Sequence, residues 1–151
     1  MRRRDRELPK EFGLELIDRC EYGTAAMIDE NGQPYAVTLN LVREENKLYF
    51  HCAIEGKKIG SLRKNPNMCI SFVGNVSPVP DKFTTLYESA IVRGKAVEMT
   101  EDEEKIHALR ILCEKLTPAN MSNFDEAIER SLRRTAVWRI DIEEITAKAK
   151  R

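Results

Sequence analysis

The stretch LYFHCAIEGKKI, residues 48–59, changes from a strand pattern to the start of a helix. Its first part is aromatic or apolar around a single His51, as in a strand, and Gly56 with two lysines follows as a turn. A short helix predicted over Lys58–Lys64 begins at those lysines. Because a helix start offers free backbone N–H groups and the lysines add positive charge, this junction predicts a site for a phosphate.

Strand patterns lie on both sides of this junction. Before it, Tyr22–Asp29 and Tyr35–Val42 predict a hairpin around Asn31-Gly32, because both of these turn residues tolerate positive φ. Lys47–Ala53 then completes a meander of three strands. After it, residues 74–81 contain two prolines and predict a loop, since proline is excluded from central strands. Further strands are predicted over Met68–Val73, over Phe83–Met99 with a bulge or bend at Gly94, and over Ala136–Ile142.

Helices are predicted near the start of the chain and late in it. Pro9–Cys20 carries apolar residues at helical spacing. Thr100 and Glu103 have the pattern of a capping box before a helix with an apolar stripe, and Ser122 begins another helix. Strands at hairpin spacing with helices around them predict a mainly β fold, an antiparallel β-barrel with peripheral helices. The length of 151 residues predicts a single domain over residues 1–151, with residues 1–8 as a flexible tail.

Composition argues against several functional classes. Lys+Arg and Asp+Glu both number 25, and the resulting zero net charge disfavours bulk nucleic-acid binding. No apolar run is long enough to cross a membrane, and no apolar signal region follows the basic N-terminus, so we expect a cytoplasmic protein. The four cysteines form no CxxC pair, and no metal site is expected.

An ordered series of motifs extends from about Cys20 to about Lys148. In its order and spacing, this series resembles the pyridoxamine 5'-phosphate oxidase-like flavoproteins with an FMN-binding split barrel. Within them it is most similar to the nitroimidazole-resistance (Nim) branch, in which a His is expected at the place of His51. The motifs are GTAA at 23–26, PYAVTL at 34–39, LYFHCA at 48–53, GKK at 56–58, LRKNP at 62–66, YESAIVRGKA at 87–96 and WRI at 138–140.

The resemblance implies a homodimer with two FMN sites at the subunit interface. It also implies which residues bind the cofactor. Those that would line the isoalloxazine ring are Val37, Thr38, Leu39 and Asn40. Those beside the ribityl chain and ring would be His51, Cys52 and Ala53, and Lys57 and Lys58 would bind the phosphate. Further candidates, which would reach the site across the dimer, are Tyr87, Glu88, Ser89 and Trp138.

The implied function is an FMN-dependent oxidoreductase that takes a hydride from a nicotinamide donor or another reductant. It would pass electrons to a small electrophile such as a nitroaromatic. His51 would be the catalytic residue, as a hydrogen-bond donor or as an acid near neutral pH. Tyr35 and His51 stand where the true oxidase has a basic residue and a Thr-rich turn. Its C-terminal substrate-binding segment is not evident, which argues against pyridoxamine phosphate oxidation.

Other interpretations of the same residues stay open. The fold could hold a flavin, a deazaflavin or heme without turnover. Without the resemblance, a small β-barrel interaction protein also fits, with Lys57 and Lys58 as a solvated helix start. His51 would then be an ordinary histidine at a strand end, and Trp138 a residue of the core or of a dimer interface.

Overall fold

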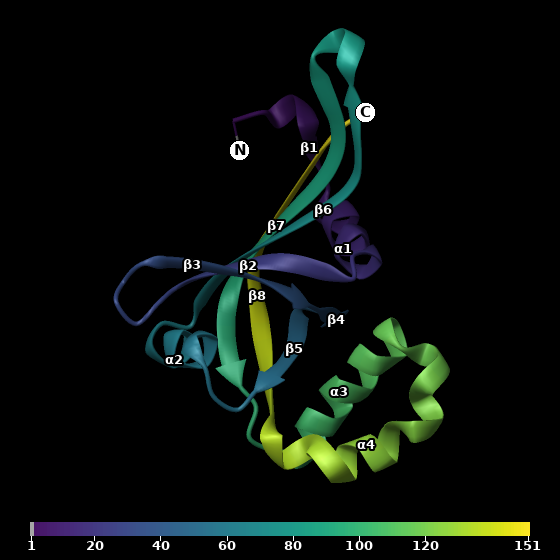
Figure 1. Cartoon of the computed structure of the whole chain (residues 1–151). Coiled ribbons are helices and arrows are strands. Elements are labelled where there is room, and N and C mark those ends of the chain that lie inside the picture. Colours follow the sequence, from purple (N-terminus) through teal and green to yellow (C-terminus); the bar gives the residue numbers. More distant parts are fainter. Residues whose placement is uncertain (1) are drawn as a thin grey trace.

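The computed structural model describes residues 2–151, whose centre is one curled antiparallel sheet with helices around it (Figure 1). The strands are β1 (Glu7–Leu8), β2 (Tyr22–Ile28), β3 (Pro34–Asn40), β4 (Val42–Glu44), β5 (Lys47–Ala53), β6 (Asn67–Val79), β7 (Thr84–Glu98) and β8 (Thr135–Lys150). The α-helices are α1 (Lys10–Arg19), α2 (Lys57–Lys64), α3 (Asp102–Leu116) and α4 (Phe124–Ser131). Short 3-10 helices are η1 (Arg4–Arg6), η2 (Pro80–Lys82), η3 (Pro118–Asn123) and η4 (Leu132–Arg134). No helix among residues 2–151 is long and apolar enough to span a membrane.

The strands follow the order β3-β2-β6-β7-β8-β5-β4, and β1 pairs with β8 outside that path. Every ladder is antiparallel. Within the described residues no ladder joins the two end strands, β3 and β4, so the curled sheet stays open along one side. The structure is thus a split barrel, and the predicted mainly β barrel with peripheral helices is confirmed.

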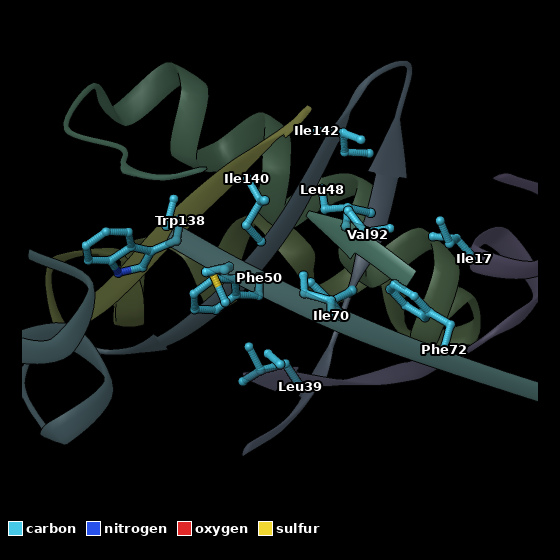
Figure 2. Packing of buried hydrophobic residues seen from close by; sticks show 14 of the residues in the cluster. Ile17, Leu39, Leu48, Phe50, Ile70, Phe72, Val92, Trp138, Ile140 and Ile142 are labelled. Carbon is cyan, nitrogen blue, oxygen red and sulfur yellow. The ribbon is translucent and has the colours of Figure 1, made fainter. Parts of the chain in front are cut away.

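Apolar side chains from alternate strand positions fill the interior of the barrel (Figure 2). Phe50 on β5 and Trp138 on β8 are register partners, and their rings stack with centroids 6.5 Å apart. The exposed fractions of these two residues are 0% and 2%. α1 and α2 add Ile17 and Leu62 to the same cluster. This core therefore fixes the end of β5 against α2.

A second core lies on the opposite face of β5 and β8, against α3 and α4. Tyr49 and Val137 of the strands pack there with Leu112 and Phe124 of the helices. Because neighbouring strand positions point to opposite faces, Tyr49 belongs to this second core while Phe50 belongs to the barrel interior.

β6 continues to Val79, so the loop predicted over residues 74–81 is wrong. The ladder with β7 shifts its register between Gly74 and Ser77 and then continues, with Pro78 opposite Thr85. β2 pairs with β6 only at residues 69–71, so the distal part of β6 is an edge strand, where proline is tolerated. With β7 it forms an arm that projects beyond the barrel (Figure 1).

The bulge predicted at Gly94 is confirmed. β7 runs as one strand, and its register with β8 shifts between Arg93 and Gly94. A Cβ atom at Gly94 would lie 2.3 Å from the carbonyl oxygen of Asp141, which is closer than any side chain permits. Glycine is therefore required for β8 to approach at this point.

The β2–β3 hairpin and the strand after it differ in detail from the prediction. Within the turn only Gly32 has a positive φ, of 78°, and Asn31 does not. The reason is a longer loop, closed by a 2.8 Å bond from the Asp29 N–H to the Gln33 carbonyl. The strand predicted over Tyr35–Val42 ends at Asn40, and Val42 begins β4.

The predicted capping box is also wrong. The Thr100 hydroxyl donates to the Glu101 carboxylate at 3.3 Å instead of accepting from a helix amide. α3 begins at Asp102, and none of the described side chains caps its first turn. Three acidic residues there interact favourably with the helix dipole instead.

The end of the predicted N-terminal tail is part of the sheet. Glu7 and Leu8 form β1 and pair with Lys148 and Ala147 of β8. Arg4–Arg6 form the short 3-10 helix that precedes β1.

Lys115 connects α3 to the barrel and to α1 by hydrogen bonds. Its Nζ donates to the carbonyl oxygens of Ile17, Cys20 and Leu41 at 3.4, 2.6 and 2.9 Å. The first two carbonyls lie at the C-terminal end of α1, where a positive charge is favourable to the helix dipole. Partial burial of the ammonium group lowers the pKa of Lys115 from its usual value of 10.5.

Replacing this lysine by methionine, Lys115→Met, keeps an unbranched side chain but removes the donor shared by three carbonyls. We expect the free energy of unfolding to fall by about 1–3 kcal/mol, as measured by urea denaturation. Lys105→Met is the matched control, because Lys105 donates only to the Leu132 carbonyl, at 3.3 Å. Equal losses in the two variants would contradict the role of Lys115 as a clamp.

Candidate functional site

The start of α2 is open to an anion. It follows Gly56, whose φ of 133° suits glycine, and its first turn contains no acidic residue. The amides of Ile59 and Gly60 donate to the Gly56 carbonyl at 3.1 and 3.2 Å. The amides of Lys57 and Lys58 have no acceptor among residues 2–151. Two free N–H groups at a positive helix end are suited to bind a phosphate.

The two lysines at this helix start differ in their surroundings. The Lys57 Nζ lies 3.0 Å from Oδ2 of Asp29 and 4.6 Å from the ring centroid of Tyr35. The Lys58 Nζ lies over the Phe50 ring, 5.7 Å from its centroid, and has no carboxylate within 4.0 Å in the part of the chain that is described. Lys58 is therefore the cation without a protein counter-charge.

The three β5 residues predicted to contact the cofactor do not share one face. Cys52 points into the barrel interior like Phe50, whereas His51 and Ala53 share the face of Tyr49. Burial raises the pKa of the Cys52 thiol from its usual value of 9.0, so the thiolate is disfavoured.

His51 lies near the end of β5, close enough to the start of α2 for the charge of Lys58 to act on it. Its side chain is exposed, yet the protein around it removes part of its hydration. This desolvation, and then the charge of Lys58, lower the pKa of His51 from its usual value of 6.5. At neutral pH the imidazole is therefore uncharged, with one N–H donor and one acceptor nitrogen.

β3 is an end strand, and one of its edges carries no ladder within residues 2–151. The Asp29–Gln33 pair is hydrogen-bonded, and bonded and non-bonded pairs alternate along an antiparallel ladder. Val37 and Leu39 therefore bond to β2, and their side chains pack with the barrel core. The backbone N–H and C=O groups of Thr38 and Asn40 point to the open edge, and their side chains are exposed.

Tyr87, Glu88 and Ser89 lie together on β7, near the base of the arm. The Glu88 carboxylate is buried and accepts from Arg19, Asn75 and Arg151 at 3.1, 2.6 and 3.3 Å. The Tyr87 ring has the Lys148 Nζ 5.6 Å from its centroid.

Two buried polar atoms lack hydrogen-bond partners within the described chain, namely Oγ of Ser89 and Nε1 of Trp138. Both belong to residues that the family resemblance implies as cofactor contacts. Ser89 is 9% exposed and lines a depression of about 300 Å³ on the outer face of the sheet, with Arg93 and Lys148 beside it. Trp138 is packed in the core against Phe50, so the main role of its indole ring is to stabilise the barrel core.

The predicted site residues form two groups within one chain. The first is the open edge of β3 with the end of β5, the start of α2 and Trp138. The second is residues 87–89. Trp138 pairs with Glu98, and Ser89 lies nine positions before Glu98 on β7, a distance of about 30 Å along a strand. Ser89 therefore lies far from Trp138, whereas the ladders through β2 and β6 connect Thr38 of β3 to Ile91 of β7, only about 15 Å across three strand spacings.

The outer face of β2 and β6, which the sequence did not single out, is uncharged. All of its residues are partly or fully exposed to solvent, yet none is charged, whereas 33% of the residues in the chain are charged. Strand alternation alone, applied to both strands, would have revealed it. The residues are Tyr22, Thr24, Ala26 and Ile28 of β2 and Asn67, Cys69, Ser71 and Val73 of β6.

A family model described as pyridoxamine 5'-phosphate oxidase matches residues 11–149. A comparison with curated proteins found no match. Among solved structures, a proposed 5-nitroimidazole antibiotic resistance protein from Bacteroides thetaiotaomicron is 28% identical, with a TM-score of 0.79, over 95% of this chain and 86% of that chain.

Two further solved structures support the fold alone, because their identities are low. The flavocytochrome Anf3 from Azotobacter vinelandii is 20% identical, with a TM-score of 0.80, over 95% of this chain and 68% of that chain. An FAD and heme binding protein from Mycobacterium smegmatis is 17% identical, with a TM-score of 0.79, over 95% of this chain and 71% of that chain.

The geometry at His51 generates a test by NMR. We expect the imidazole of His51 to titrate below 6.5, and Lys58→Met to raise its pKa because a nearby positive charge is removed. Lys57→Met is the matched control and should leave the pKa of His51 unchanged, since the Lys57 ammonium is paired with Asp29. A pKa that is unchanged in Lys58→Met, or shifted equally in both variants, would show that Lys58 does not act on His51.

Proposed function

The chain belongs to the pyridoxamine 5'-phosphate oxidase family, and we propose that it is an FMN-binding oxidoreductase that works as a homodimer. This family has a flavin-binding fold, and solved structures with the same fold include a flavocytochrome and an FAD and heme binding protein. The proposed acceptor of electrons is a small electrophile such as a nitroaromatic. It is supported by the likeness to the proposed 5-nitroimidazole resistance protein.

The observation that carries the proposal is the open start of α2. Lysines at the positive end of a helix oppose its dipole, and without a ligand they are unfavourable there by about 0.3–1 kcal/mol each. A bound phosphate would reverse this cost, because it would accept from the free amides of Lys57 and Lys58 and face the unpaired charge of Lys58. We propose that the phosphate of FMN is the anion bound here.

The other predicted residues fit a ring held beside the same helix. The open edge of β3 offers backbone donors and acceptors at Thr38 and Asn40, which suit the polar edge of an isoalloxazine ring. The unpartnered hydroxyl of Ser89 could bond to a ligand in the depression that it lines. As the resemblance implies, we propose that Ser89 reaches the cofactor held by a second copy.

When bound, FMN supplies the electron-transfer chemistry. The protein would hold the phosphate at α2, orient the ring along β3 and place His51 near both. As a neutral imidazole, His51 could donate a hydrogen bond to the ring or to a substrate without adding a positive charge. Because the pKa of His51 is lowered, little of its imidazole is protonated at neutral pH. We therefore assign His51 a role as a hydrogen-bonding group and not as an acid.

A homodimer is supported by the uncharged outer face of β2 and β6. Surfaces that lack charge over adjacent strands are typical of the centre of an interface. A two-fold axis through this face would pack it against the same face of a second copy. In such a dimer, we propose that residues 87–89 of one copy reach the cofactor held by the other.

Flavin binding is tested by the visible spectrum of the purified protein and by titration with FMN. We expect flavin absorbance in the protein as purified, or quenched FMN fluorescence on titration. Lys58→Ala should weaken FMN binding at least tenfold, because it removes the unpaired charge at the phosphate, a loss of about 1.4 kcal/mol. Lys47→Ala, at the opposite end of β5, is the matched control.

Other outcomes of this experiment have definite meanings. A colourless protein that neither quenches FMN nor gains thermal stability from it would overturn the proposal. A heme Soret band would show that the fold serves another cofactor. If FMN binds but is neither bleached by a nicotinamide donor under anaerobic conditions nor reoxidised by a nitroaromatic, the protein is a flavin carrier and not this oxidoreductase.

The dimer is tested by a charge on the uncharged face. Thr24→Lys changes an exposed side chain, so the chain should still fold, but the buried charge should disfavour association. We expect a dimer for the unmodified protein at micromolar concentration in analytical ultracentrifugation, and a shift to monomer for Thr24→Lys. Thr100→Lys, at an exposed position before α3, is the control and should stay dimeric. A monomeric unmodified protein would rule out the dimer.

A further inference from the structure

The loop of the β2–β3 hairpin packs against α2 (Figure 1). The Lys57 Nζ lies 3.0 Å from Oδ2 of Asp29, and the Lys64 Nζ donates to the Glu30 carbonyl at 2.5 Å. Between these contacts the loop approaches Gly60, where a Cβ atom would lie 2.7 Å from a carboxylate oxygen of Glu30. The loop therefore contacts α2 from its first turn to its last.

Asp29 is the centre of this contact. It is buried, with an exposed fraction of 6%, and its Oδ1 accepts from the backbone N–H groups of Asn31 and Gln33 at 2.9 Å each. Its second oxygen is thereby aimed at Lys57. A buried carboxylate with fixed orientation is a strong partner for an ammonium group.

The pairing separates the roles of the two lysines. The Lys57 ammonium is held between Asp29 and the Tyr35 ring, on the hairpin side of the helix start. The amides of Lys57 and Lys58 have no acceptor in the described chain, and the Lys58 Nζ lies over the Phe50 ring instead of beside a carboxylate. Without Asp29, two unpaired cations would crowd one helix end and the first turn of α2 would lose its anchor.

From these contacts we infer that Asp29 is a positioning residue of the phosphate site. It holds Lys57 and the first turn of α2 in place, so that Lys58 and the two free amides bind the phosphate directly. This inference rests on the proposed FMN function and adds a role for a residue of the hairpin. It also assigns different roles to the two lysines. Lys57 positions the first turn of α2, and Lys58 binds the phosphate.

The test compares FMN with riboflavin, which has the same ring but no phosphate. Asp29→Asn keeps an oxygen for the two loop amides but removes the charge that holds Lys57. We expect it to weaken FMN binding by about three- to tenfold and to leave riboflavin binding unchanged, as measured by fluorescence titration. Asp81→Asn, at an exposed position near the tip of the arm, is the matched control and should change neither affinity.

A double-mutant cycle with Lys57→Met tests whether Asp29 acts through Lys57. Once Lys57 is methionine, we expect Asp29→Asn to have no further effect on FMN affinity. Lys58→Ala should remove most of the preference for FMN over riboflavin in either background.

Three results would overturn the inference, and they are distinguishable. Equal weakening of FMN and riboflavin in Asp29→Asn would mean that Asp29 only stabilises the fold. Tighter FMN binding in Asp29→Asn would mean that the released Lys57 is itself the phosphate ligand. If the unmodified protein binds neither flavin, the proposed function fails and the positioning role fails with it.

Discussion

The pairing of β8 with β7 on one side and β5 on the other is the constraint on which the structure depends. Residues 138–141 of β8 carry both ladders at once, so this segment is central in the sheet. The alternating side chains of β8 supply Trp138 to the barrel interior and Val137 to the core under α3 and α4. The same ladder fixes residues 50–53 of β5, and hence where the chain turns into α2. The place of the candidate phosphate site is thus a consequence of strand pairing.

Much of this arrangement is encoded locally and could be predicted from sequence. Lys47–Ala53 has the predicted bounds, because an apolar strand between two polar turns leaves little choice of register. The bulge at Gly94 is equally local, since a glycine inside a strong strand pattern marks close approach of another backbone. The order of motifs along the chain identified the family, which the match over residues 11–149 confirms.

The features that could not be predicted depend on contacts distant in sequence. The sequence predicts a loop at Pro78, because a proline pattern does not reveal that β2 leaves the distal part of β6 as an edge. Strand alternation cannot show that Asp29 meets Lys57, which is far along the chain and on another element. The resemblance implies the same phosphate-binding role for both lysines, and only the position of the hairpin loop distinguishes their surroundings. The separation of Ser89 from Trp138 likewise follows from the distance along β7, which no motif records.

The open edge of β3 links the fold to its proposed function. An exposed strand edge invites pairing with other chains, and proteins usually cover or interrupt it. Here Pro34 interrupts its beginning, but Thr38 and Asn40 still present unpaired backbone groups beside the end of β5 and the start of α2. A planar ligand with donors and acceptors on its rim would satisfy those groups without extending the sheet. Under the proposed function, a flavin ring would lie along this open edge in place of a further strand, and the charge at α2 would hold its phosphate.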